Sequence, residues 1–300
     1  MRILVTGGTG FVGSNIVKEL SGKGHEIIIT GSDAEQEVNK DVAKYLQPGL
    51  TGIDWEALGK LDLVFHEAAI NNTLLNDRTE MLRGNLEASR ELFERVVNSG
   101  CKRIVYASST AVYGNVPAPF REDGPIVPLN VYGESKKMLD EFAMDFAEKN
   151  PDIVVVGLRY CNVYGPGEGH KGKRASMIYQ LARQMQKGRP RLFKDGEQKR
   201  DWIYVEDVVT ANLLAVKAPK SCVVNCGSGK ASSFNTIVGI LNTLLGTDWQ
   251  PEYIENPHIA TYQNYTYCDM TYAKKMIGFV PQFDIESGLK KYFAAGLFNS

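Results

Sequence analysis

The sequence lacks the features that mark several large classes of protein. Among its 300 residues, 34 are basic and 35 acidic, which leaves a formal charge of −1. No excess of either sign predicts binding to nucleic acid or to a charged membrane surface. No apolar run approaches the ~18 residues that a membrane-spanning helix needs, and no signal peptide is recognisable. We therefore expect a cytoplasmic protein that has neither nucleic acid nor a membrane as a partner.

Cysteine is scarce and scattered along the chain. The shortest spacing, between Cys222 and Cys226, is not that of a CxxC pair, and neither the spacing nor the number of ligands suits zinc. The stretch around these two residues predicts a buried strand that runs into a turn. We predict no metal site and no redox role, and the pattern is typical of a reducing compartment. The five cysteines are Cys101, Cys161, Cys222, Cys226 and Cys268.

Apolar runs of two kinds alternate along the first half of the chain. Short runs rich in valine and isoleucine predict strands, and longer stretches with apolar residues at helical spacing predict helices. This alternation predicts an α/β fold with a Rossmann-like doubly wound parallel sheet. The expected strands are 2–8, 25–31, 61–69, 102–109 and 152–165, and the expected helices are 11–24, about 80–98 and 130–150.

The alternation breaks at about residue 165. We predict a dinucleotide-binding Rossmann domain over residues 1–165 and a smaller substrate-binding lobe mainly over 166–300. Part of the later chain, at about 200–225, is expected to return to the first domain. No proline- or serine-rich linker separates the two parts, so we expect one compact unit with a cleft between the lobes.

Three glycines follow the first predicted strand at regular spacing. In the stretch VTGGTGFVG, Gly7, Gly10 and Gly13 lie three residues apart, where the strand gives way to a helix. The first glycine permits a tight turn, the second lets the backbone approach a pyrophosphate, and the third lets the helix pack closely on the strand. The N-terminus of that helix then faces the phosphate charge. The position of the motif predicts a dinucleotide-binding site.

The spacing of these glycines resembles that of the short-chain dehydrogenase/reductase superfamily. Extended members of the superfamily usually carry an aspartate at the end of the second strand, which binds the ribose hydroxyls of NAD. This chain has Gly31 and Ser32 there, with Asp33 later and no arginine or lysine close by. Loss of the carboxylate removes the repulsion of a 2′-phosphate, but no cationic group replaces it. The sequence does not decide between NAD and NADP as the cofactor, and it slightly favours NADP.

Tyr132 and Lys136 are the first candidates for catalysis. Their i, i+4 spacing places both on one face of the predicted helix. The lysine ammonium is expected to lower the pKa of the phenol, so that Tyr132 acts as a general base towards a hydroxyl. Upstream, the stretch VYASSTAVYG ends a predicted strand in hydroxyl groups, at the sheet edge where α/β proteins bind ligands. With Ser109 from this stretch, the three residues resemble the catalytic triad of the same superfamily.

The residues that follow Ser109 argue against one branch of the superfamily. Nucleotide-sugar dehydratases carry an acidic pair after the catalytic threonine, which removes water from the sugar. The sequence Thr110-Ala111-Val112 provides no carboxylate, so dehydration is not expected.

Several stretches together resemble the ADP-L-glycero-D-manno-heptose 6-epimerase family, over nearly the whole chain. Most of these motifs are general to extended nucleotide-sugar epimerases, and EGHKG is the specific one. The stretches are FHEAA (65–69), YASS (106–109), PLNVYGESK (128–136), RYCNVYGPGEGHKG (159–172), LF (192–193), KRDWIYVEDV (199–208) and TYQNYTYCDM (261–270).

The resemblance implies a second acid/base at Lys171. Such an epimerase moves a hydride from an alcohol carbon to NAD(P), leaves a ketone, and returns the hydride to the other face. The hydroxyl lies on opposite sides in substrate and product, so one base does not easily serve both. The composition of residues 164–176 predicts a loop, and a lysine there could have the lowered pKa that this chemistry needs. The alternative is that His170 and Lys171 form a cationic loop that contacts the diphosphate.

Further site residues are carried over from the same resemblance. Cofactor contacts are implied at Phe11, Val12, Glu67, Ala68, Ala69, Asn71, Asn85 and Val163, together with Gly7, Gly10, Gly13, Gly31, Ser32, Tyr132, Lys136 and Lys171. Substrate contacts are implied at Ser109, Asn162, His170, Lys173, Gln180, Phe193, Arg200 and Tyr262.

The chain departs from the family where the substrate should bind. Lys173 and Arg174 follow the GHKG motif, where the family has small or apolar residues. Gln180 replaces a histidine, and the turn after Phe193 is one residue shorter. These changes leave open which sugar and which nucleotide base the substrate carries.

The resemblance predicts a nucleotide-diphosphate-heptose 6-epimerase whose partner is a nucleotide-diphosphate sugar, and it suggests a homo-oligomer. A UDP-hexose 4-epimerase, which needs no GHKG lysine, and a related nucleotide-sugar reductase are alternatives among enzymes. A non-catalytic NADP-sensing protein on the same fold is the alternative of another class. Proteins of that kind typically lose the tyrosine–lysine pair, which this chain retains at Tyr132 and Lys136.

Overall fold

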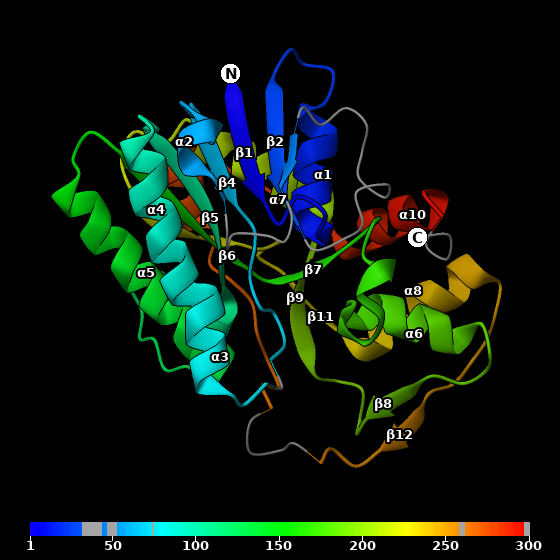
Figure 1. The fold of residues 1–300 in the computed structure, drawn as a ribbon. Coiled ribbons are helices and arrows are strands. Elements are labelled where there is room, and N and C mark those ends of the chain that lie inside the picture. Colours follow the sequence, from blue (N-terminus) through cyan, green and yellow to red (C-terminus); the bar gives the residue numbers. More distant parts are fainter. Residues whose placement is uncertain (32–43, 47–52, 74, 258–261, 297–300) are drawn as a thin grey trace.

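The fold is built on a parallel sheet of seven strands in the order β10-β6-β5-β4-β1-β2-β3 (Figure 1). The computed structural model describes residues 1–31, 44–46, 53–73, 75–257 and 262–296. The order of β1 to β6 is that of a Rossmann sheet, so the predicted doubly wound α/β fold is confirmed. The strands are β1 (Arg2–Thr6), β2 (Glu26–Thr30), β3 (Lys44–Leu46), β4 (Leu63–His66), β5 (Arg103–Ser109), β6 (Val154–Tyr160) and β10 (Cys222–Cys226).

Helices cover both faces of this sheet (Figure 1). Because side chains alternate along a strand, Ile3 and Val5 of β1 point into one apolar core, and Leu4 points into the other. The first core contains residues of α1 (Phe11–Leu20), α7 (Val205–Ala215) and α9 (Thr271–Ile277). The second contains residues of α2 (Trp55–Leu58), α4 (Ala88–Asn98) and α5 (Val131–Lys149).

The helix expected over residues 80–98 is interrupted. Helix α3 (Arg78–Leu82) continues into a π-helical turn, η2 (Arg83–Glu87), before α4 begins. Such turns inside helices often mark functional positions. This one contains the buried Asn85, whose contacts are described below.

The strand predicted over 152–165 is two strands in different sheets, so this expectation is wrong. The chain leaves the large sheet at Cys161, and β7 (Asn162–Tyr164) pairs in parallel with β9 (Lys199–Tyr204). Strand β9 also pairs with the antiparallel β11 (Ala231–Ser233). The break follows from these new partners, because no glycine or proline separates the two strands in the sequence.

The C-terminal part has its own apolar core. It unites side chains of α6 (Met177–Met185), α8 (Phe234–Leu245), α10 (Ile285–Ala294) and β9. A small sheet of β8 (Arg191–Phe193) and β12 (Glu252–Ile254) lies below α6 and α8 in Figure 1, on the side away from α10. Strand β10 rejoins the large sheet, while the division of the chain at residue 165 stays a prediction. Among the described helices, none combines the length and the apolar character needed to span a membrane.

Candidate active site

The glycine-rich turn between β1 and α1 is closely packed. Gly7 has a φ of 64°, and its carbonyl oxygen accepts a hydrogen bond of 2.9 Å from the Gly10 N–H. A Cβ on Gly13 would lie 2.2 Å from that same oxygen. Helix α1 begins without a side-chain cap and without an acidic residue in its first turn. Its first N–H groups, together with this close backbone approach, fit the pyrophosphate of a dinucleotide.

The end of β2 lies directly against this turn. A Cβ on Gly31 would lie 2.2 Å from the hydroxyl oxygen of Thr9. Only glycine therefore allows the present contact between the two segments at this position. Ser32, the other residue predicted at the ribose, lies outside the described residues.

The segment after β4 approaches the same turn. A Cβ on Gly7 would lie 2.8 Å from the backbone nitrogen of Ala68. Asn85 supports the segment: its Oδ1 accepts from the Ile70 N–H at 2.7 Å, and its Nδ2 donates to the Ile70 carbonyl at 3.0 Å. The Nδ2 also lies 3.1 Å from the hydroxyl of Ser135 on α5. Asn85 thus holds the predicted cofactor segment in place, while Asn71 is exposed and Ala69 is half-buried.

Tyr132 and Lys136 lie together on the first two turns of α5. The helix begins where the side chain of Asn130 accepts a hydrogen bond of 2.8 Å from the Gly133 N–H. The ammonium nitrogen of Lys136 lies 5.9 Å from the centroid of the Tyr132 ring. Ser109, the last residue of β5, lies close enough to the Tyr132 side chain to act on its pKa. The structure therefore brings together the three residues of the predicted triad.

The expected lowering of the Tyr132 pKa by Lys136 is wrong. Burial raises the pKa of Tyr132 above its ordinary value, and only the side chain of Ser109 opposes this effect. Burial lowers the pKa of Lys136 from 10.5 to about 8, against the opposing charges of Glu67 and Asp140. The lysine is therefore still mainly protonated at neutral pH, and its charge is retained beside the phenol.

Glu67 has an unusually high pKa for a carboxyl group. Burial raises its pKa from 4.5 to about 7, although a hydrogen bond from Tyr160 and the charge of Lys136 act in the other direction. The Tyr160 hydroxyl donates to Glu67 Oε1 at 3.0 Å and accepts from Asn212 Nδ2 at 2.8 Å. From the sequence Glu67 was assigned only to the cofactor lining. Its position at the end of the apolar run LVFH was the signal that it is at least half-buried.

The GHKG motif is not an open loop, contrary to the expectation from its composition. Residues Gly169–Arg174 form a 3-10 turn, η4, which is kinked at Gly172 with φ 53° and ψ −120°. The turn folds around the carboxylate of the fully buried Glu168, which accepts hydrogen bonds from the Gly165 N–H at 3.1 Å and the Ser176 hydroxyl at 3.0 Å. The sequence analysis missed this acidic residue, although it stands in the motif.

Within this turn, Lys171 is the residue that points to the cofactor turn. Its ammonium nitrogen lies 5.2 Å from the centroid of the Phe11 ring, at the start of α1. Burial lowers the pKa of Lys171, and the carboxylate of Glu168 opposes the shift. His170 and Lys173 are exposed. This position suits both a second acid/base and a diphosphate ligand.

Three of the predicted substrate residues form one cluster. The guanidinium carbon of Arg200 lies 4.9 Å from the Tyr262 ring centroid and 5.9 Å from that of Phe234. The ring of Tyr262 also meets that of Phe193 edge to face, with 5.4 Å between centroids. The cluster thereby joins residues from β8, β9 and the segment after residue 261, which are far apart in the sequence.

The remaining predicted residues lie on β7, α6 and α1. Asn162 Nδ2 donates to the Asp201 carbonyl at 2.9 Å, and Val163 pairs with Ile203 in the β7–β9 ladder. Gln180 Nε2 donates to the backbone carbonyls of Lys173 and Ala175, at 3.2 and 2.8 Å. Gln180 thus fixes the end of the GHKG turn. Val12, in the first turn of α1, is half-buried.

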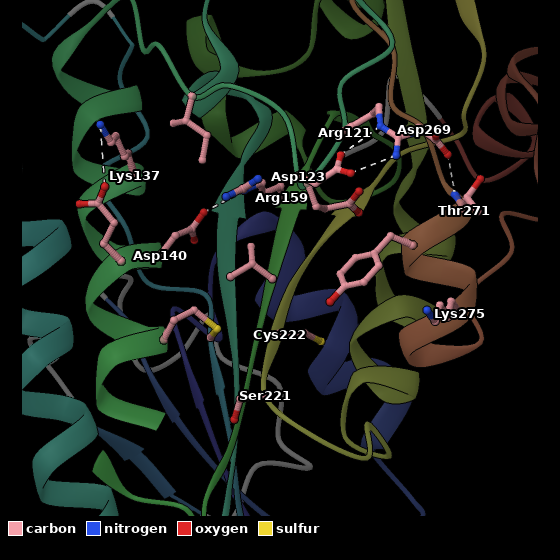
Figure 2. Close-up of a pocket in the computed structure, with 16 residues that line it drawn as sticks. Arg121, Asp123, Lys137, Asp140, Arg159, Ser221, Cys222, Asp269, Thr271 and Lys275 are labelled. Atoms are coloured by element: carbon pink, nitrogen blue, oxygen red, sulfur yellow. Dashed lines mark hydrogen bonds and ion pairs between the residues drawn. The ribbon is translucent and has the colours of Figure 1, made fainter. Parts of the chain in front are cut away.

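A separate pocket of 720 Å³ lies between α5 and α9, beside β10 (Figure 2). Figure 2 shows the Arg159 guanidinium directed at Asp140, with 2.9 Å between Nε and Oδ2. Tyr106 donates to the same carboxylate at 3.0 Å, and Arg159 Nη1 donates to the Tyr113 hydroxyl at 2.8 Å. None of the predicted site residues lines this pocket. Its buried ion pair anchors α5 one turn beyond Lys136.

Comparison with known proteins finds relatives over almost the full length. A family model described as "NAD dependent epimerase/dehydratase family" matches residues 3–227. An ADP-L-glycero-D-manno-heptose-6-epimerase of Alkalilimnicola ehrlichii is 37% identical over 314 residues, covering 98% of this chain and 97% of that protein. The crystal structure of the Helicobacter pylori ADP-L-glycero-D-manno-heptose-6-epimerase is similar at a TM-score of 0.88 and 35% identity, covering 98% and 95% of the two chains. A Thermotoga maritima UDP-glucose 4-epimerase with UDP-glucose has a TM-score of 0.89 and 29% identity, covering 99% and 100%.

Proposed function

Because the chain belongs to the NAD dependent epimerase/dehydratase family, we propose that it is a nucleotide-diphosphate-heptose 6-epimerase of the ADP-glycero-manno-heptose type. The resemblance to heptose epimerases predicted from the sequence is confirmed by 37% identity over nearly the whole chain. The observation that carries the proposal is the pairing of Tyr132 and Lys136 on α5, beside Ser109 at the carboxyl end of β5.

The cofactor is a nicotinamide dinucleotide held by the glycine-rich turn. The closely packed Gly7 and Gly13 and the uncapped start of α1 support this assignment. When bound, the nicotinamide takes a hydride from an alcohol carbon and returns it. At the end of β2 the chain has Gly31 in place of a carboxylate, which favours NADP over NAD. Denaturing the purified protein and identifying the released nucleotide tests this preference.

Tyr132 transfers the proton of the reacting hydroxyl, and Ser109, at the end of β5 beside Tyr132, orients that hydroxyl. Burial raises the pKa of Tyr132, so the phenol gives up its proton only when positive charge lies beside it. The ammonium of Lys136 lies 5.9 Å from the ring centroid, but its charge alone does not bring the pKa of the phenol below its ordinary value. The neighbouring Glu67 helps to keep this lysine protonated, because its negative charge raises the pKa of Lys136.

Lys171 acts as the acid/base for the opposite orientation of the hydroxyl. Its lowered pKa and its place over Phe11, beside the cofactor turn, support this role. Arg200, stacked on Tyr262, binds the diphosphate, for which a guanidinium offers paired donors. Asn162 contacts the sugar from the start of β7.

A UDP-hexose 4-epimerase is the second candidate, favoured by the close structural match to the Thermotoga maritima UDP-glucose 4-epimerase. The two functions are separated by incubating the protein with ADP- and GDP-heptoses and with UDP-hexoses, and following the epimers by NMR. Epimerisation of a heptose at C6 supports the first function. Epimerisation of UDP-hexoses alone overturns it.

A further inference from the structure

Two cysteines that are far apart in the sequence meet in the structure. The Sγ atoms of Cys161 and Cys268 lie 3.0 Å apart, although 107 positions separate the residues in the chain. The sequence analysis gave these cysteines no role, because no motif joins them. We propose that Cys161 and Cys268 are an oxidisable dithiol, which closes to an intramolecular disulfide next to the substrate-binding residues.

The backbone on both sides holds the two thiols in contact. Cys161 follows β6, and its N–H donates to the Cys226 carbonyl at 2.9 Å. Cys268 forms a bridge with Phe120, flanked by hydrogen bonds from Phe120 N to the Tyr267 carbonyl at 2.8 Å and from Asp269 N to the Phe120 carbonyl at 2.9 Å. A disulfide bond is about 2.05 Å long. The sulfur atoms need to approach by only about 1 Å to form it.

A bound metal ion explains this pair less well. Asp201 lies beside the two thiols, and the three ligand atoms are within 4.8 Å of one another. Its carboxylate, however, accepts four hydrogen bonds, from Ser228 N and Oγ at 2.7 Å each, Gly229 N at 3.0 Å and Cys268 N at 3.2 Å. These bonds use the acceptor positions of the carboxylate. Two thiols remain, where a structural zinc site takes four ligands.

Cys161 is the residue that reacts first. Its side chain is partly exposed, whereas Cys268 is only 1% exposed. Burial raises the pKa of both thiols, that of Cys161 well above its ordinary value, so access to the oxidant and not acidity favours Cys161. The reaction is therefore slow at neutral pH and accelerates as the pH rises, because the thiolate is the nucleophile.

A small peroxide is the oxidant that suits a partly buried thiol. The Cys161 thiolate attacks one oxygen of hydrogen peroxide, the O–O bond breaks, and a sulfenic acid forms with release of one water after protonation. The Cys268 sulfur then attacks the sulfenic sulfur, the S–O bond breaks, and a second water leaves as the disulfide forms. In the balance, two thiols and one peroxide give one disulfide and two waters.

The pair adjoins the residues proposed to bind substrate, and this consequence rests on the proposed function. Asn162 directly follows Cys161, and its amide donates to the backbone carbonyl of Asp201 at 2.9 Å. Tyr262 belongs to the same segment as Cys268, and it stacks on Arg200. A disulfide draws this segment towards the β6–β7 junction, so the KM for the nucleotide sugar rises severalfold while the cofactor turn is untouched.

The test uses the full chain treated with hydrogen peroxide, blocked with iodoacetamide and analysed as tryptic peptides. We expect a cross-linked Cys161–Cys268 peptide and a mass loss of about 2 Da. The number of free thiols should fall below the five of the reduced chain, and dithiothreitol should reverse all three changes. The variants Cys161→Ala and Cys268→Ala abolish the cross-link, and the control variants Cys101→Ser and Cys222→Ser retain it. A KM that rises on oxidation and recovers with dithiothreitol, in wild type but not in Cys161→Ala, supports the consequence for substrate.

Absence of this peptide at peroxide concentrations that oxidise the other thiols overturns the proposal. A cross-link to Cys226 in place of Cys268 also overturns it. The peptide readout does not depend on turnover, so a protein that epimerises no nucleotide sugar still decides whether the dithiol closes. Failure of the proposed function and failure of this inference are therefore distinguishable.

Discussion

The ammonium of Lys136 donates a hydrogen bond of 2.8 Å to the backbone carbonyl of Ala107, and so ties helix α5 to the end of β5. Two residues further along β5 lies Ser109, which acts on the pKa of Tyr132. The partner of the lysine is a neutral carbonyl, so its positive charge is fixed in place without being neutralised. The proposed role of Tyr132 as an acid/base depends on this arrangement.

Tyr132→Phe removes the proton-transferring hydroxyl but keeps the ring beside Lys136. We expect kcat for heptose epimerisation to fall by about 10²–10⁴-fold, the usual contribution of a general acid/base. Binding of the nucleotide sugar, measured by calorimetry, is expected to change little. Tyr253→Phe, which changes an exposed tyrosine of β12, is the matched control. Turnover within tenfold of wild type would argue against Tyr132 as the acid/base.

Glu67→Gln is expected to change how stability depends on pH. The pKa of Glu67 is raised from 4.5 in the unfolded chain to about 7 in the folded protein. The stability that the protonated carboxyl contributes is therefore complete below pH 4.5 and is lost as the pH rises through about 7. The loss amounts to about 3 kcal/mol at most. The glutamine cannot ionise and still accepts a hydrogen bond from Tyr160, so this decrease disappears.

Denaturant unfolding between pH 5 and 8 measures the effect. Wild type should lose stability across this window relative to Glu67→Gln. Glu141→Gln, at an exposed position of α5, serves as the control and should keep the wild-type slope. Parallel pH profiles for wild type and Glu67→Gln would contradict the raised pKa.

Lys171→Met separates the two roles open to this lysine. Methionine keeps an apolar stem over Phe11 and removes the amine. As a second acid/base, Lys171 should contribute at least about 10²-fold to kcat, with substrate affinity nearly unchanged. Lys187→Met, at an exposed lysine after α6, is the control. Weakened binding with full turnover at saturation would instead make Lys171 a diphosphate ligand.

Gly13→Ala should disable the dinucleotide turn. The new Cβ would lie 2.2 Å from the backbone oxygen of Gly7, and backbone on both sides leaves little room to adjust. We expect the purified variant to carry no nucleotide and to melt at a lower temperature. Gly239→Ala, also on a helix but with no atom within 4 Å of its Cβ, should raise stability by about 0.5–1 kcal/mol. Normal cofactor content in Gly13→Ala would contradict the assignment.

Arg200→Lys keeps the charge but loses the planar fork and the stacking on Tyr262. Because a guanidinium binds phosphate oxygens in pairs, we expect the Kd for the nucleotide sugar to rise by about 10–100-fold, as for a lost charged hydrogen bond. Arg183→Lys, at an exposed position of α6, is the comparison. An unchanged Kd would remove Arg200 from the diphosphate site.

The parts of the fold that follow from local patterns were predictable. Apolar runs with helices between them indicated the parallel sheet, and the glycine spacing indicated the turn before α1. The break at Cys161 was not predictable, because it depends on the pairing of β7 with β9 and no glycine or proline marks it in the sequence. The π-helical turn at Asn85 depends in the same way on a partner segment, that of Ile70.

The site was predictable in its residues more than in its electrostatics. The i, i+4 spacing placed Tyr132 beside Lys136, but it suggested a lowered pKa for the phenol, and burial by the folded chain reverses the sign. The contact of Cys161 with Cys268 depends on tertiary structure alone, whereas Glu168 makes its hydrogen bonds within its own segment. The roles of the single residues, the choice of NADP, the homo-oligomer and the cytoplasmic location stay predictions.

The most direct measurement of the central claim is an NMR time course of the purified protein with ADP-glycero-manno-heptose, run beside one with UDP-glucose. We predict that the resonances of the 6-epimer appear and reach a constant ratio, with no net consumption of reduced or oxidised nicotinamide nucleotide, and that Tyr132→Phe abolishes the conversion. A heptose that stays unchanged while UDP-glucose is epimerised at C4 would contradict the account.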